Sequence, residues 1–141
     1  MQGRLLVLAL KCKETFSRIR VRTRFVTFFM GEIVVLVTVG SEDEATKISR
    51  ILVERELAAC VNMISGVRSI FQWDGKITEE QEFLLLIKTV DQAFDQLALA
   101  VKTNHSYSVP EVIALPILHG TGDYLAWIRS VTKIRKSNAE E

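Results

Sequence analysis

The sequence has few of the residues that build disulfide or metal-bound frameworks. Its 141 residues include two cysteines, two histidines, two prolines and seven glycines. Cys12 and Cys60 cannot form a disulfide framework or a cysteine-only zinc site. The longest apolar runs, residues 5–10 and 33–37, fall far below the roughly 18 residues that a membrane span needs. Because hydrophobic residues still make up 48% of the chain, the composition predicts one globular domain that does not span a membrane.

Positive charge is concentrated at the start of the chain. Residues 1–29 contain seven basic residues and one acidic residue, whereas the whole chain has a formal net charge of only +1. The remainder is therefore acidic, which argues against a nucleic-acid partner. We predict a basic leader over residues 1–29, either unstructured or the product of a start assigned upstream of Met30. A transit peptide, which is rich in arginine and poor in acids, is the alternative. The domain is expected over residues 30–136 and a tail over 137–141.

The first half of the domain reads as strand, helix, strand. Residues 33–39 are a continuous β-branched apolar run, typical of a buried strand. Ser41 and Glu44 have the spacing of a capping box, which predicts a helix to about Glu56. A second strand is expected over residues 58–64, with a turn at Ser65-Gly66 and a half-exposed strand over residues 67–73.

The second half repeats that order. Asp74-Gly75 is a strong signal for a type I′ hairpin turn, so residues 77–89 should return as a strand whose polar part, residues 78–82, is solvated. Apolar spacing predicts a helix from Phe94, and residues 111–118 a strand placed at a sheet edge by Pro116. A last helix is expected over residues 124–135. This order predicts an α+β fold, the ferredoxin-like βαββαβ sandwich with an extra C-terminal helix.

Five stretches in this order resemble the CutA divalent-cation tolerance family. They read LAACVN, SIFQWDGKI, LIKT, HSYSVPE and GDYLAW, at residues 57–62, 69–77, 86–89, 105–111 and 122–127. The resemblance implies a ferredoxin-like fold and a homotrimer related in architecture to the PII signalling proteins. It also implies a cytoplasmic location and a link to copper and other divalent cations.

The resemblance also indicates where a metal would bind. Family members credited with a copper site can use a cysteine and two adjacent histidines, and the matching positions here are Val37, Asn104 and His105. Only His105 remains a strong ligand, so we expect at most weak Cu²⁺ binding by His105, assisted by Glu111. The alternative for His105 is a histidine that ends a helix and bonds to backbone. His119 has no suitably spaced partner.

Five further residues of these motifs are candidates for a ligand cleft or a subunit interface. Lys88 ends an apolar strand, where its amine needs a partner that Glu111 could supply. Trp73 lies beside the predicted hairpin tip, where an exposed aromatic often anchors a partner. The remaining candidates are Tyr107, Asp123 and Trp127. Cys60 is expected to be a buried small hydrophobe, and Glu79, Glu80 and Glu82 a solvated hairpin face.

The resemblance therefore implies a non-enzymatic homotrimer that acts in divalent-cation tolerance. No nucleophile elbow or phosphate-binding loop is present. The alternative is a PII-like sensor that binds a small ligand in subunit clefts around Lys88, Tyr107 and Glu111. Either protein would have a metal ion or a small ligand as its partner, and neither a nucleic acid nor a membrane.

Overall fold

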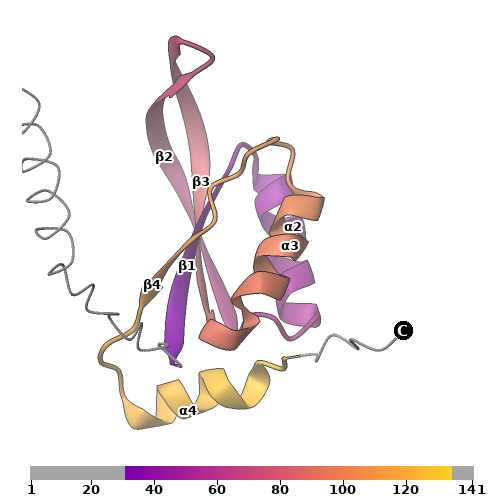
Figure 1. The fold of residues 1–141 in the computed structure, drawn as a ribbon, viewed down its shortest axis with the longest axis vertical. Helices are drawn as coiled ribbons and strands as arrows, with labels where there is room; N and C mark the ends of the chain where they lie inside the picture. Colours follow the sequence, from indigo (N-terminus) through magenta and orange to yellow (C-terminus); the bar gives the residue numbers. More distant parts are fainter. Residues whose placement is uncertain (1–30, 135–141) are drawn as a thin grey trace, which may run out of the picture.

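A computed structural model of the chain describes residues 31–134. The predicted leader, residues 1–29, and the predicted tail, residues 137–141, lie outside the described residues. Figure 1 shows the arrangement of the secondary-structure elements, which follow one another in the order β1 (Glu32–Val39), α2 (Glu42–Glu54), β2 (Cys60–Trp73), β3 (Lys76–Val90), a 3₁₀ turn (Asp91–Ala93), α3 (Phe94–Asn104), β4 (Ile113–Pro116) and α4 (Gly122–Val131).

The strands form one antiparallel sheet in the order β2-β3-β1-β4. Helices α2 and α3 lie together on one face of the sheet, and α4 runs across the end opposite the hairpin tip (Figure 1). This is the ferredoxin-like α+β sandwich with an added C-terminal helix, as the order of sequence patterns predicts. No helix between residues 31 and 134 is long and apolar enough to cross a membrane.

The main core lies between the sheet and the two helices α2 and α3. Successive strand residues point to opposite faces, and along β1 and the inner half of β3 every second apolar residue is fully buried. These buried residues are Val35, Val37, Val39, Leu85 and Ile87, which pack with Ile48, Leu52, Leu97 and Val101 of the helices. The alternate residues, such as Val34, Leu36, Leu84 and Leu86, are only half-buried. They lie on the face that α2 and α3 leave uncovered.

The hairpin is longer than predicted, because the expected turn at Ser65-Gly66 is wrong. Those residues form a bulge within the continuous strand β2, where the pairing register shifts between Ile64 and Val67. Gly66 has a φ of +77° there, which costs little without a Cβ. The predicted turn at Asp74-Gly75 is confirmed, since both residues have positive φ, 49° and 74°, and Trp73 pairs with Lys76.

The last two elements are shorter than predicted. β4 spans only Ile113–Pro116 because residues 105–112 form a loop that crosses from α3 to the β1 edge. Its place at the sheet edge is confirmed, and Pro116 ends it. α4 ends at Val131, after which the Lys133 N–H donates to the Glu56 carbonyl at 2.9 Å. That bond ties the end of the described chain back to the turn after α2.

Candidate functional site

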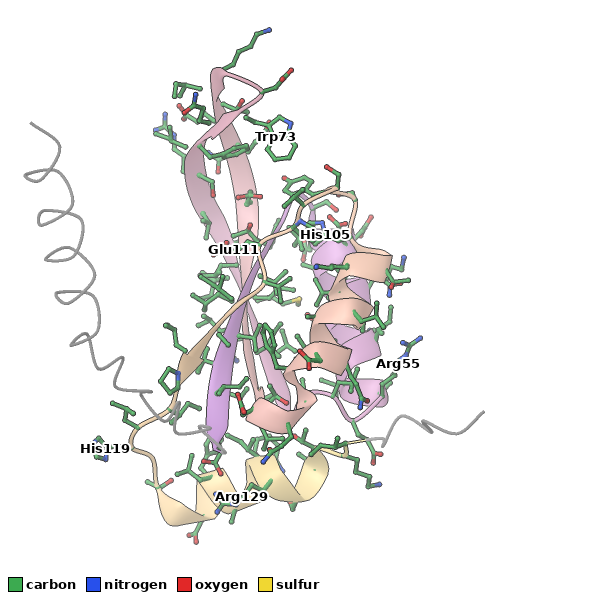
Figure 2. All side chains as sticks on the ribbon, in the orientation of Figure 1. Arg55, Trp73, His105, Glu111, His119 and Arg129 are labelled. Carbon is green, nitrogen blue, oxygen red and sulfur yellow. The ribbon has the colours of Figure 1, made fainter. Side chains whose placement is uncertain are left out.

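A groove of about 650 Å³ lies between the outer half of the hairpin and the loop before β4. Trp73 lies on the hairpin and Glu111 on the loop, with His105 at the loop's beginning (Figure 2). Register pairs place the hairpin side chains of the groove on the face that α2 and α3 do not cover. The groove is lined by Thr38, Ser69, Phe71, Trp73, Thr78, Glu80, Glu82, Tyr107, Ser108, Val109, Pro110 and Glu111.

A hydrogen bond between Tyr107 and Glu82 closes the inner end of this groove. The Tyr107 hydroxyl donates to Glu82 Oε1 at 3.0 Å, and Glu82 is only 4% exposed. Burial, this bond and the charges of Glu82, Glu80 and Glu44 raise the pKa of Tyr107 from 10.0 to about 12. Gly40 makes room for the ring, since a Cβ there would lie 3.1 Å from the Tyr107 hydroxyl oxygen.

His105 does not line the groove but lies buried beside it. Its side chain has no exposed area, and both ring nitrogens have partners. The Tyr107 N–H donates to Nδ1 at 3.0 Å, so Nδ1 carries no proton and Nε2–H donates to the Thr38 carbonyl at 2.8 Å. This arrangement matches the alternative prediction, a histidine that ends a helix and bonds to backbone, because His105 is the residue that follows α3.

Glu44 joins the start of α2 to the same loop. The Glu44 N–H donates to Ser41 Oγ at 3.2 Å, so Ser41 caps the helix as the sequence predicts. The Glu44 carboxylate accepts hydrogen bonds from the backbone N–H and the hydroxyl of Ser106, the latter at 3.1 Å. It also lies 3.7 Å from His105 Nδ1. These contacts fix the loop where it leaves α3.

The positions that match the family's metal ligands do not form a ready metal site. Val37 is fully buried in the core, and Asn104 Nδ2 donates to the Ala100 carbonyl at 2.9 Å. Residues 31–134 contain no group of three or more His, Cys, Asp or Glu residues that could hold a metal ion. A copper ion bound by His105 would have to displace one of the ring's two hydrogen bonds.

Lys88 also has partners that the sequence did not indicate. The predicted partner was Glu111, but Lys88 Nζ donates to Asn62 Oδ1 and to the Leu86 carbonyl, the latter at 3.3 Å. The Asn62 contact follows from the register, because Cys60 pairs with Lys88 and Asn62 with Leu86 on the neighbouring strand. Lys88 therefore lies on the uncovered face of the sheet but does not line the groove.

Asp123 and Trp127 lie on α4, away from the groove. Asp123 is an exposed residue in the first turn of that helix. Trp127 is 40% exposed and contacts Tyr124, with ring centroids 5.3 Å apart. Burial and the neighbouring Cys60 raise the pKa of Tyr124.

Cys60 is half-buried rather than buried, and His119 is exposed in the loop before α4. Of the candidate site residues, Trp73, Tyr107 and Glu111 line the groove. His105, Lys88, Asp123 and Trp127 do not line it.

Sequence reasoning missed two carboxylates of the groove. Glu80 and Glu82 were expected on a solvated face, but both line the groove and Glu82 is buried. Alternation along β3 carries the signal, because Glu80 and Glu82 continue the even-numbered series of Leu84 and Leu86 on one face of the strand. The burial of Glu82 depends on contact with Tyr107, which belongs to the loop before β4.

Comparisons with known proteins agree with this fold. The family described as CutA1 divalent ion tolerance protein matches residues 33–131. The divalent-cation tolerance protein CutA of Thermus thermophilus is 52% identical over 101 residues, which are 72% of this chain and 98% of that protein. The chloroplastic protein CutA of Arabidopsis thaliana is 44% identical over 101 residues, 72% of this chain but only 56% of that longer protein.

A solved structure shows the same architecture. The structure of the divalent cation tolerance protein from Thermus thermophilus superposes with a TM-score of 0.71 at 51% sequence identity. The match covers 72% of this chain and 99% of the other. The names of the two Thermus thermophilus matches refer to divalent-cation tolerance.

Proposed function

Because this chain belongs to the CutA1 divalent ion tolerance family, we propose that it acts in divalent-cation tolerance as a non-enzymatic homotrimer. The observation that carries the proposal is the uncovered face of the sheet. Leu115 is 55% exposed and Ile113 50% exposed. These β4 residues pair with Val34 and Leu36 of β1, respectively, so all four lie on that face. An apolar sheet face left open to water is typical of a protein interface.

The hairpin supports the same proposal. Its outer half has exposed apolar residues on both faces, with Ile70 and Ile77 on one side and Phe71 and Trp73 on the other. β2 is also a 14-residue edge strand with one side of its backbone unpaired in the sheet. Long exposed edges invite pairing with another chain. Insertion of the hairpin between neighbouring copies would cover both faces and the edge.

Contact between these two surfaces is compatible with a closed trimer. The uncovered face and the projecting hairpin are different parts of the chain, so contact between them is head-to-tail, and rotation by a third of a turn closes a head-to-tail contact into a ring. The relatives' names are silent on assembly, so the number three comes from the resemblance to the family and is open to direct measurement.

Multi-angle light scattering of the full chain at micromolar concentration tests the assembly. We expect three times the mass of one chain, and a monomeric mass would contradict the proposal. Leu115→Asp should dissociate the assembly because it introduces a charge into the apolar face. Leu99→Asp is the matched control, since Leu99 is similarly exposed but lies on the outer surface of α3, and it should leave the mass unchanged.

We propose that this protein binds copper weakly. His105 supplies a nitrogen donor suited to Cu²⁺, but its burial and its two hydrogen bonds oppose coordination. Glu111, the other predicted ligand, is exposed on the wall of the groove. Binding through these residues requires local rearrangement and is therefore weak. A cytoplasmic location and the PII-like sensing alternative stay predictions.

A further inference from the structure

Lys88 is a half-buried cation without an anionic partner in the described part of the chain. Its Nζ donates to Asn62 Oδ1 and to the Leu86 carbonyl, and both acceptors are neutral. Lys88 pairs with Val34 and so lies on the sheet face that the proposed assembly covers. Since a covering copy would remove water from the ammonium group, that copy would have to bring a carboxylate to it. The ion pairs between residues 31 and 134 use four other basic residues, Arg68, His105, Arg129 and Lys133.

The groove beside the hairpin has the opposite imbalance of charge. Its lining residues include Glu80, Glu82 and Glu111 but no lysine, arginine or histidine. Glu82 is buried and bonded to Tyr107. Glu80 is exposed and belongs to none of the ion pairs formed between residues 31 and 134. A cation from another copy would therefore meet negative potential and an unpaired carboxylate at Glu80.

Lys88 and Glu80 are too far apart to pair within one chain. Both belong to β3, and the eight residues between their positions correspond to about 26 Å at roughly 3.3 Å per residue. Because both positions are even-numbered, the two side chains lie on the same face of the strand. One end of this face thus carries an unpaired cation and the other end an unpaired carboxylate. Contact between the two requires a second copy of the chain.

The head-to-tail contact described above brings these two ends together. In that contact the uncovered face of one copy, which carries Lys88, meets the hairpin of the next copy, whose outer half carries Glu80. We propose that Lys88 of one copy enters the groove of its neighbour and forms an ion pair with Glu80 there. The groove is then a composite site, completed by a cation that its own chain does not supply. This inference rests on the proposed assembly and adds the polar contact that determines which surfaces meet.

Carbodiimide cross-linking of the full-length protein tests this contact without any substitution. The reagent activates a carboxylate, and a lysine amine in contact with it forms an amide bond while the reagent leaves as a urea. We expect covalently linked chains on a denaturing gel, in which mass spectrometry identifies peptides joined through Lys88 and Glu80. Since the separation within one chain is too large, that amide can form only between copies. Lys88→Met and Glu80→Gln should each abolish it.

Charge reversal tests whether the pair stabilises the assembly. Lys88→Glu and Glu80→Lys each place like charges in contact, so either change should raise the concentration at which half of the chains are assembled by roughly tenfold or more. Light scattering on dilution measures that concentration. The double variant restores opposite charges and should return it to within about threefold of the unmodified value. Lys102→Glu, in the exposed last turn of α3, is the matched control and should have no effect. Circular dichroism checks the fold of each variant.

Two results would overturn the proposal while leaving the assembly intact. One is a trimeric mass without a cross-link between Lys88 and Glu80, which would mean that the neighbouring copy places other residues at Lys88. The other is failure of Glu80→Lys to restore the Lys88→Glu variant, and restoration by Glu111→Lys instead would move the contact to the loop side of the groove. A monomeric mass for the unmodified protein has a different meaning, because it contradicts the assembly itself.

Discussion

The two faces of the sheet carry similar sequence but have different surroundings. On β3, Leu85 and Ile87 are fully buried under α2 and α3, whereas Leu84 and Leu86 are half-buried on the other face. The first face is complete within one chain. The second is apolar along β1, β3 and β4 and is covered by a helix only at one end, where Ile128 of α4 packs against Val90. Toward the hairpin it leads to the groove with its carboxylates and aromatic rings.

This difference separates residues that stabilise one chain from residues that are available to a partner. Sequence apolarity alone does not make the distinction, because residues 83–87 read as one continuous apolar run. The run is typical of a strand buried on both faces. Since α2 and α3 cover only one of them, most of the second face is available to a neighbouring copy, and this supports the proposed assembly.

Truncation of the covered face should give the largest change in stability. Ile87→Ala removes a fully buried side chain and should lower the free energy of unfolding by about 2–5 kcal/mol. The measurement is urea denaturation followed by circular dichroism. Leu86→Ala is the matched control on the other face. Its effect should grow with protein concentration, because stability gained through assembly depends on concentration. Equal, concentration-independent losses would contradict the difference between the two faces.

A smaller loss is expected where the loop joins the covered layer. His105→Ala leaves the Tyr107 N–H and the Thr38 carbonyl without their partner. Because both bonds are only part-buried, we expect a total cost of about 1–3 kcal/mol. His119→Ala, in an exposed loop, should change stability by less than about 0.5 kcal/mol. The same denaturation measurement applies. If the two variants were equally stable, His105 would have no role in positioning the loop.

The fold could be predicted almost completely because its signals are local. The capping residue Ser41, the Asp74-Gly75 turn and the alternation on β3 each specify a short segment, and the order of segments selects the sandwich. The bulge at Ser65-Gly66 was misread because Gly66 suits a turn and a bulge equally well.

The site was predicted only in part because it depends on contacts between distant segments. Tyr107 meets Glu82 across 25 positions, and His105 meets Thr38 across 67. The family motifs located Trp73, Tyr107 and Glu111, but they could not show that the ring of His105 is fully bonded. The burial of Glu82 required the same knowledge of how the loop lies over the hairpin.

Copper titration measures how strongly the buried histidine resists coordination. By isothermal calorimetry we expect a dissociation constant no tighter than about 1 μM, because a strong Cu²⁺ site needs several nitrogen or sulfur donors. Most of that binding should be lost in His105→Ala and retained in His119→Ala. Nanomolar binding that survives His105→Ala would place the ion at Cys60 or His119 and would remove His105 from the proposed metal site.

The smallest expected effect is the pH dependence contributed by Tyr107 on the uncovered face. Its pKa is raised from 10.0 to about 12, so the neutral phenol is favoured in the folded chain. The resulting stability is fully present below pH 10.0 and is lost as pH rises from 10.0 to about 12. A Tyr124→Phe background leaves Tyr107 as the only tyrosine, and its phenolate absorbance can then be titrated directly.

Glu82→Gln should move this titration toward pH 10 and narrow the pH range over which stability falls, because it removes the charge next to the phenol while burial remains. An unchanged titration would mean that burial and the charges of Glu80 and Glu44 raise the pKa of Tyr107, and that the charge of Glu82 does not contribute.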